Sequence, residues 1–116
     1  MSLESAIFDA LKGLVASRVY PDEAPQKVNL PFIIYQQVGG SPVNFMDIST
    51  PSKKNARIQI SVWGDSRNQV APLARSAEDA LRSATGLQSS VLGAPVALID
   101  SATKLRGTQQ DFSIWY

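Results

Sequence analysis

The chain has 116 residues, of which 11 are basic and 10 acidic, and it contains neither cysteine nor histidine. This composition excludes disulfides, zinc sites with thiolate or imidazole ligands, thiol catalysis and general bases built on histidine. With 44% hydrophobic residues and a net charge of +1, residues 1–116 are expected to form a single domain, without a global charge that points to nucleic acid or to an anionic membrane.

The first element expected is an amphipathic helix over residues 3–18. Ser2 precedes it as a candidate N-cap, and Gly13 weakens its middle by about 1 kcal/mol relative to alanine. Apolar residues recur at helical spacing and form one stripe, which must be buried against another element. The stripe consists of Leu3, Ile7, Ala10, Leu11, Leu14 and Val15.

Two strands are expected in the first half of the chain. Residues 32–38 are rich in β-branched and aromatic side chains and are apolar on both faces at their start. Residues 56–63 alternate, with Ile58, Ile60 and Val62 pointing one way, toward the core. Val19 and Tyr20 are candidates for a further, very short strand.

Between these two strands lies a long irregular segment, residues 39–55. Loops of this length inside a small domain are usually functional or mobile. The segment carries apolar side chains that must either tuck under the domain or be covered by a partner, and the sequence leaves both alternatives open. These side chains are Val43, Phe45, Met46 and Ile48.

A small basic cluster, Lys53, Lys54 and Arg57, ends this segment and begins the following strand. Such a cluster is either a solvated surface or a contact for a partner or a phosphate. We therefore take Phe45, Met46, Ile48, Lys53, Lys54 and Arg57 as candidate partner or oligomer contacts.

The second helix is expected to open with the capping-box pattern from Ser66 to Gln69 and to end at Gly86. Pro72 would distort a helix that begins this early, and the alternative is a start near Ala71. Residues 85–95 read as a loop. The short strand 96–100 and the alternating run 108–116 are expected to pair as a hairpin.

This order of elements, α-β-β-α-β-β, predicts an α+β fold. We expect a mostly antiparallel sheet of about four strands with two helices packed on one face.

The sequence offers no constellation for catalysis, for a cofactor or for a metal, and we therefore expect a protein that is not an enzyme. Glu78 and Asp79 are neighbours on a helix and diverge by about 100°, so they cannot share one substrate. The longest apolar stretch, residues 94–99, is too short to span a membrane. Glu4 and Asp9 are unlike a secretory signal, so a cytoplasmic location is the default expectation.

Several segments in order carry a resemblance to a known family. The opening helix and Val19-Tyr20-Pro21 are followed by the segment from Leu30 to Gly40. The segment from Asn55 to Gly64 then leads into an alanine-rich helix, and the chain closes with residues 111–116. This pattern resembles the small tail-completion proteins of long-tailed bacteriophages and prophages. They are often classed as a domain of unknown function and are similar to tail terminators and tail-to-head joining proteins.

The resemblance implies a structural protein without catalytic residues, located in the tail or neck of the virion and, during assembly, in the cytoplasm of the bacterial host. Its expected partners are the tail tube protein and the head-tail connector proteins, with no membrane and no specific nucleic acid. It would form a ring, usually a hexamer, on the tail tube, with an isolated monomer as the alternative state. The competing hypothesis is a monomeric protein- or nucleic-acid-binding module that uses residues 53–57.

Overall fold

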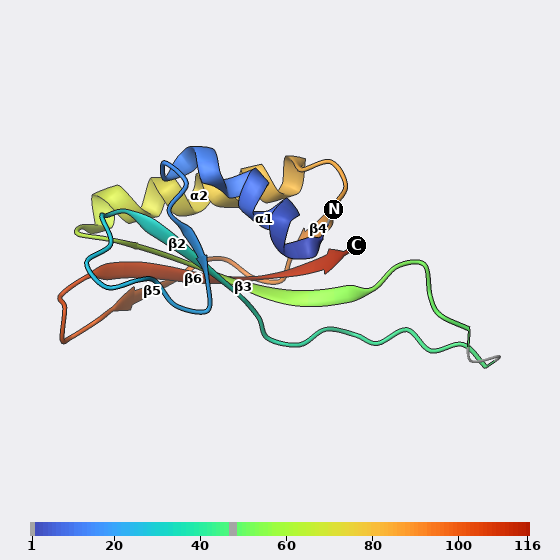
Figure 1. Ribbon diagram of the computed structural model, residues 1–116. Coiled ribbons are helices and arrows are strands. Elements are labelled where there is room, and N and C mark those ends of the chain that lie inside the picture. Colours follow the sequence, from blue (N-terminus) through green and yellow to red (C-terminus); the bar gives the residue numbers. More distant parts are fainter. Residues whose placement is uncertain (1, 47–48) are drawn as a thin grey trace.

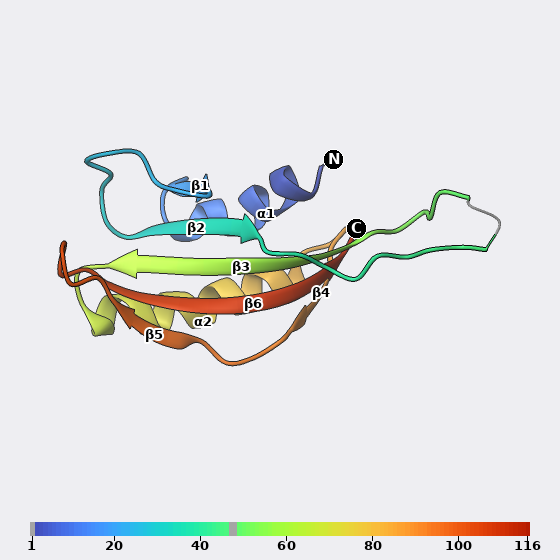
Figure 2. The same cartoon turned by 90° about the horizontal axis from the view of Figure 1, so that it is seen from below.

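The computed structural model describes residues 2–46 and 49–116. In this part of the chain, two α-helices lie on one face of a β-sheet and leave the other face open (Figures 1 and 2). The helices are α1 (Leu3–Leu11) and α2 (Arg67–Ser83), with a 3₁₀ turn at Lys12–Leu14. The strands are β1 (Val19–Pro21), β2 (Phe32–Gln37), β3 (Asn55–Gly64), β4 (Gln88–Val91), β5 (Val96–Ile99) and β6 (Arg106–Trp115). The predicted α+β class is confirmed.

The sheet has more strands than the sequence predicted. Its described residues form six strands in the order β1-β2-β3-β6, with β4 and β5 both paired to the far edge of β6. The pair β1 and β2 is parallel, whereas every other pair in the described sheet is antiparallel. The expectation of about four strands was therefore wrong in number, whereas the mostly antiparallel pairing is confirmed and the β1–β2 pair makes the sheet mixed. The short strand at Val19 and Tyr20 is present.

Strand β4 lies within the segment 85–95 that was expected to be a loop. Its sequence, Gln-Ser-Ser-Val, has no apolar alternation that would identify a strand. It is a strand because residues 88–91 pair in register with Val91 opposite Phe112 and Gln88 opposite Trp115. The predicted hairpin of β5 and β6 is confirmed.

The core lies between the helices and the inner face of the sheet. Ile58, Ile60 and Val62 are each at most 2% exposed, as their alternation predicts. Phe112 and Ile114 of β6 face the same way, beside the neighbouring strand β3. The helices contribute Leu3, Ala6, Ile7 and Leu11 from α1, and Val70, Ala74, Ala77 and Leu81 from α2.

Helix α1 is shorter than the predicted helix over residues 3–18. Ser2 caps it as expected, since its hydroxyl accepts a hydrogen bond from the Ser5 amide. The α-helix ends at Leu11, and Ala16 and Ser17 have φ angles of +50° and +67°. Left-handed residues cannot continue a right-handed helix. Val15 is nevertheless buried, so the apolar stripe extends past the end of the helix.

Helix α2 begins at Arg67 with Ser66 as its N-cap, which is the earlier of the two predicted starts, and it continues through Pro72. The Ser66 hydroxyl accepts from the Gln69 amide, and the Gln69 side chain accepts from the Asp65 amide at 2.9 Å. The expected end at Gly86 was wrong, because the helix stops at Ser83.

A buried polar side chain ties three elements together. The Gln110 amide group donates to a Glu78 carboxylate oxygen at 2.7 Å and to the Gly93 carbonyl at 2.9 Å. These bonds join β6 to α2 and to the β4–β5 connection. The hydrogen bond from Gln110, helped by Arg82, lowers the pKa of the Glu78 carboxyl below its ordinary value of 4.5.

Replacing Ile60 by aspartate should lower the free energy of unfolding by roughly 4 kcal/mol, because the change places an unpaired charge in the core. Ser61→Asp is the matched control, since Ser61 is the next residue on the same strand and faces the open side. Thermal or urea unfolding measures both variants. Equal stability of the two variants would contradict the assignment of the inner face.

The Glu78 carboxyl should make stability depend on pH. Its pKa is lower in the folded chain, so the unfolded chain binds more protons in acid. The stabilisation from Glu78 is complete at pH values above the pKa that Glu78 has in the unfolded chain. It is lost as the pH falls through the lower pKa that Glu78 has in the folded chain. In Gln110→Met we expect the Glu78 pKa to rise toward its ordinary value and the loss of Tm between about pH 5 and pH 3 to become shallower. Carboxyl titration by NMR measures the pKa, and Glu78→Gln is the control that removes the titrating group. An unchanged titration curve in Gln110→Met would refute the assigned cause.

Candidate functional site

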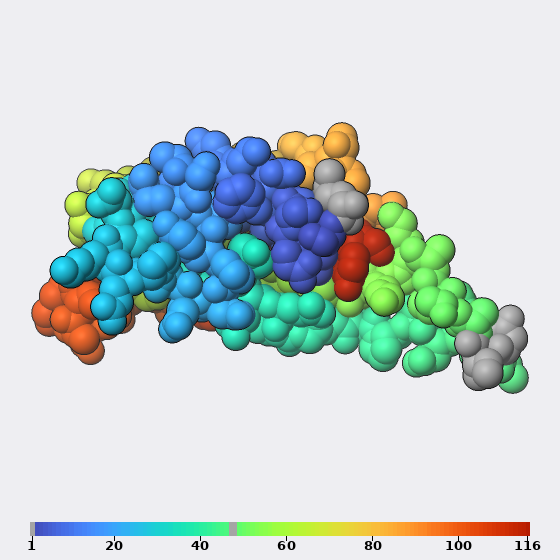
Figure 3. All heavy atoms as spheres, viewed as in Figure 1, coloured from blue at the N-terminus to red at the C-terminus, as the bar shows by residue number. Residues whose placement is uncertain are grey.

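The segment between β2 and β3 projects from one end of the sheet. We call residues 38–54 the arm, of which 38–46 and 49–54 are described. Figures 1 and 2 show that it extends well past the other loops, and in Figure 3 it stands out as a thin extension of a rounded body. The described chain measures 52 × 25 × 25 Å along its principal axes. The described arm residues lie outside helices and strands, as the sequence predicted for the loop at 39–55.

The root of the arm is held by backbone pairing on both sides. The Val38 amide donates to the Arg57 carbonyl and the Arg57 amide donates to the Gly39 carbonyl, both at 2.8 Å. Lys54 and Tyr116 exchange two backbone hydrogen bonds of 2.8 and 2.9 Å. Beyond this root, no backbone hydrogen bond joins residues 42–46 to residues 50–53 among the described residues. The root therefore fixes the direction in which the arm leaves the sheet.

Gly40 and Asn55 make the closest approach at the root. Gly40 has a φ of +151°, and a Cβ at this position would overlap the Asn55 carbonyl oxygen. The Asn55 side chain accepts from the Ser41 amide at 2.8 Å and donates to the Ser113 hydroxyl at 2.9 Å. One side chain thus connects the arm to β6.

The candidate contacts on the arm are placed away from the core. Phe45 is 48% exposed and Met46 is fully exposed. These two side chains do not tuck under the body, which was one of the two alternatives that the sequence left open. Ile48, the third apolar candidate, lies outside the described residues. Val43, the remaining described apolar side chain of the segment 39–55, is half-buried, so only Phe45 and Met46 stay without cover from this chain.

The basic cluster of the sequence is divided between two surfaces. Lys53 and Lys54 are exposed at the base of the arm, where they border a hollow of about 310 Å³ together with Val43 and Tyr116. Arg57 lies on the open face of the sheet instead, where its guanidinium forms an ion pair of 2.7 Å with Asp111. The charge of Arg57 is therefore paired with a carboxylate of the same chain. The structure does not combine the three residues into one cationic site.

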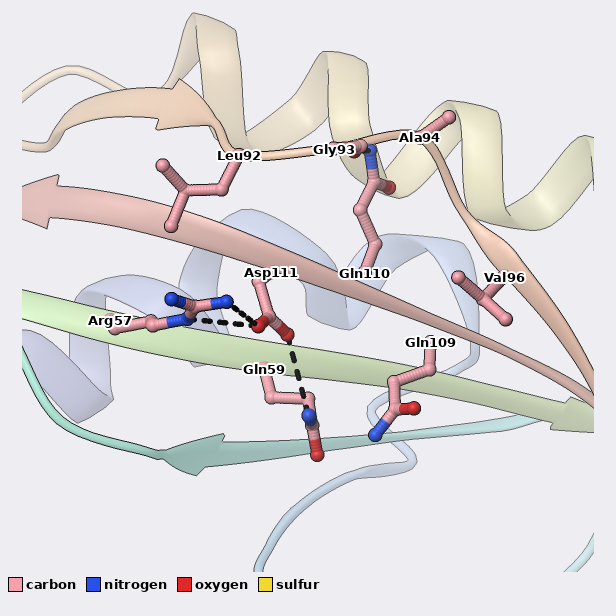
Figure 4. A pocket seen from close by; sticks show the side chains of 9 residues that line it. All are labelled: Arg57, Gln59, Leu92, Gly93, Ala94, Val96, Gln109, Gln110 and Asp111. Carbon is pink, nitrogen blue, oxygen red and sulfur yellow. Dashed lines mark hydrogen bonds and ion pairs between the residues drawn. The ribbon is translucent and has the colours of Figure 1, made fainter.

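The open face around Arg57 contains a second hollow, of about 220 Å³ (Figure 4). The Gln59 side chain donates to the other Asp111 oxygen at 3.3 Å, so one carboxylate orients both side chains. Leu92 and Val96 border this hollow and are 49% and 58% exposed. Sequence reasoning missed Asp111 and Gln59. The only available signal was the pairing of their two strands, which sets Gln59 opposite Asp111.

The described residues contain no group of three or more acidic side chains arranged to hold a metal ion. No helix in the same part of the chain has the length and apolar character needed to cross a membrane.

The comparisons with known proteins identify the family. The chain belongs to the tail completion protein gp17 family, which it matches over residues 5–116. It is therefore a structural protein of a bacteriophage tail, and the resemblance seen in the sequence is confirmed.

The fold has a counterpart among solved structures. A chain from a structure described as the virion of a native gene transfer agent (GTA) particle matches with a TM-score of 0.61 and 18% sequence identity. The match covers 98% of this chain and 93% of that chain. At this level of identity, the likeness shows a shared fold. No curated protein matches this chain.

The root of the arm gives a direct prediction. Gly40→Ala should lower the free energy of unfolding by roughly 1–3 kcal/mol, because the new Cβ both strains the backbone and overlaps Asn55. Gly39→Ala is the control, since Gly39 has a φ of +126° but open space around its Cα. Thermal unfolding and the amide chemical shifts of Asn55 and Ser113 measure the effect. Equal losses in the two variants would show that the close approach to Asn55 is unimportant.

Proposed function

We propose that this protein forms a ring, expected to be a hexamer, that caps the end of the tail tube. The ring also offers the surface that meets the head connector. Residues 1–116 act as a single tail-completion-like domain, without enzymatic chemistry, and assemble in the cytoplasm of the bacterial host. Family membership supports a role in the tail. Identifying the protein that binds the capped end next would distinguish a tail terminator from a neck-joining protein.

The arm is the observation that carries the proposal. Phe45 and Met46 are exposed on an extended segment that leaves the sheet at one end. Exposed apolar side chains on a lone subunit are a liability unless another surface covers them. In a ring on a tube, either the neighbouring subunit or the tube supplies that surface.

The edges of the sheet support the same proposal. On the β6 side, β4 and β5 pair only with β6 in the described structure, and Ile99 of β5 is 64% exposed. Free strand edges favour association with other chains. A head-to-tail contact that closes on itself gives a ring with cyclic symmetry. The low charged fraction, 18% against about 25% in typical proteins, also suits surfaces that become covered.

Purified tail tubes test the capping role. We expect the protein to bind tube ends, as seen by electron microscopy, and the double variant Phe45→Asp, Met46→Asp to bind at least tenfold more weakly, because two charges replace the apolar contact. Leu92→Asp is the control, since it places a negative charge on an apolar residue that is 49% exposed in the β4–β5 connection, outside the arm and outside the strands, and it should retain binding.

Two outcomes would contradict the proposal in different ways. Equal binding by the arm variant and the natural protein would show that Phe45 and Met46 are not contacts. Absence of the natural protein from tube ends at every concentration would refute the capping function itself. A phage deleted for this gene should accumulate tails of abnormal length or tails without heads.

A further inference from the structure

A small hollow with an acidic rim lies beside the N-terminal turn of α1, where the ends of β1 and β2 meet it. Its volume is about 190 Å³. Its floor is apolar and formed by buried side chains, and its rim carries two carboxylates and a phenol. The floor includes Leu3, Ile7 and Ile58, and the rim includes Glu4, Asp22 and Tyr35.

The two carboxylates at this rim are unpaired. Among the described residues, neither Glu4 nor Asp22 takes part in an ion pair. Burial raises the pKa of the Tyr35 hydroxyl, and the negative charges of Glu4 and Asp22 raise it further. Both carboxylates therefore act on the same phenol, and the rim above the apolar floor carries two negative charges.

A lysine side chain has the matching chemistry. Its aliphatic stem packs on apolar surface while its ammonium group reaches charges at the rim. Lys53 and Lys54, at the base of the arm, are exposed and form no ion pair with a described residue. The chain thus carries an unpaired basic surface and an unpaired acidic hollow at two different places.

We propose that Lys53 and Lys54 of one subunit dock against the Glu4–Asp22 hollow of a second copy of this chain. This inference rests on the ring proposed above and names the contact that closes it. The contact is heterologous, because the lysines of one subunit meet the carboxylates of the next. Each subunit keeps one free surface of each kind, so the contact repeats from subunit to subunit around a ring.

Charge reversal on each side tests the contact. The arm variant is Lys53→Glu, Lys54→Glu, which faces an acidic hollow with acidic side chains. The hollow variant is Glu4→Lys, Asp22→Asn. Asparagine is used because Asp22 has a φ of +65°, which asparagine tolerates. Lys27→Glu, Lys104→Glu is the control, since it reverses two exposed lysines outside the arm.

Self-association is measured by analytical ultracentrifugation and, on tail tubes, by the fraction of ends that carry rings. We expect each variant alone to associate at least tenfold more weakly than the natural protein, because like charges oppose each other. An equal mixture of the two variants should regain association, since each arm then finds a hollow of opposite charge. The control variant should associate like the natural protein, and circular dichroism should show that all variants are folded.

The outcomes separate the contact from the ring. Normal rings from both variants would refute the contact and leave the ring in place. Loss in the arm variant alone, without rescue by mixing, would mean that the lysines bind the tube and would also refute the contact. A natural protein that forms no ring, free or on tubes, would overturn the proposed function and this inference together.

Discussion

The pairing of β3 with β6 is the interaction on which the rest of the structure depends. The two strands have ten residues each and pair along their whole length, from Asn55 opposite Trp115 to Gly64 opposite Arg106. Because side chains alternate between faces, this register sends Ile58 and Phe112 into the core. A slip of one residue would turn the charged side chains of the open face toward the helices.

The same register builds the surfaces of the molecule. It places Arg57 within reach of Asp111 on the open face and aims Gln110 at α2, where Glu78 accepts its hydrogen bond. It also sets where the chain must leave the sheet. At that end the arm is held by hydrogen bonds to Asn55 and Tyr116 at its root, rather than by packing of its side chains in the core. A packed body with a projecting arm suits a family whose members complete a phage tail.

The chain contains neither cysteine nor histidine, which excludes thiolate and imidazole chemistry from its surface. The described residues present apolar side chains on the arm, an acidic hollow beside α1, and two lysines at the base of the arm that form no ion pair with a described residue. The charges of these last two surfaces are opposite and lie on separate elements. In the proposed ring, recognition between copies would rest on shape and charge, which salt and charge reversal can probe directly.

The sequence by itself determined the helical stripes, the caps at Ser2 and Ser66, the strand at 56–63 and the strand near the C-terminus. These features are encoded by periodicity and by neighbours within a few residues, and their order was sufficient to suggest the family. Only the tertiary structure decided that β1 is parallel, that residues 88–91 are a strand and that Arg57 pairs with Asp111, 54 residues away. It also decided that Glu4 and Asp22 share one rim. The physical reason is that each of these depends on a register or contact between distant segments, for which the local sequence carries no signal.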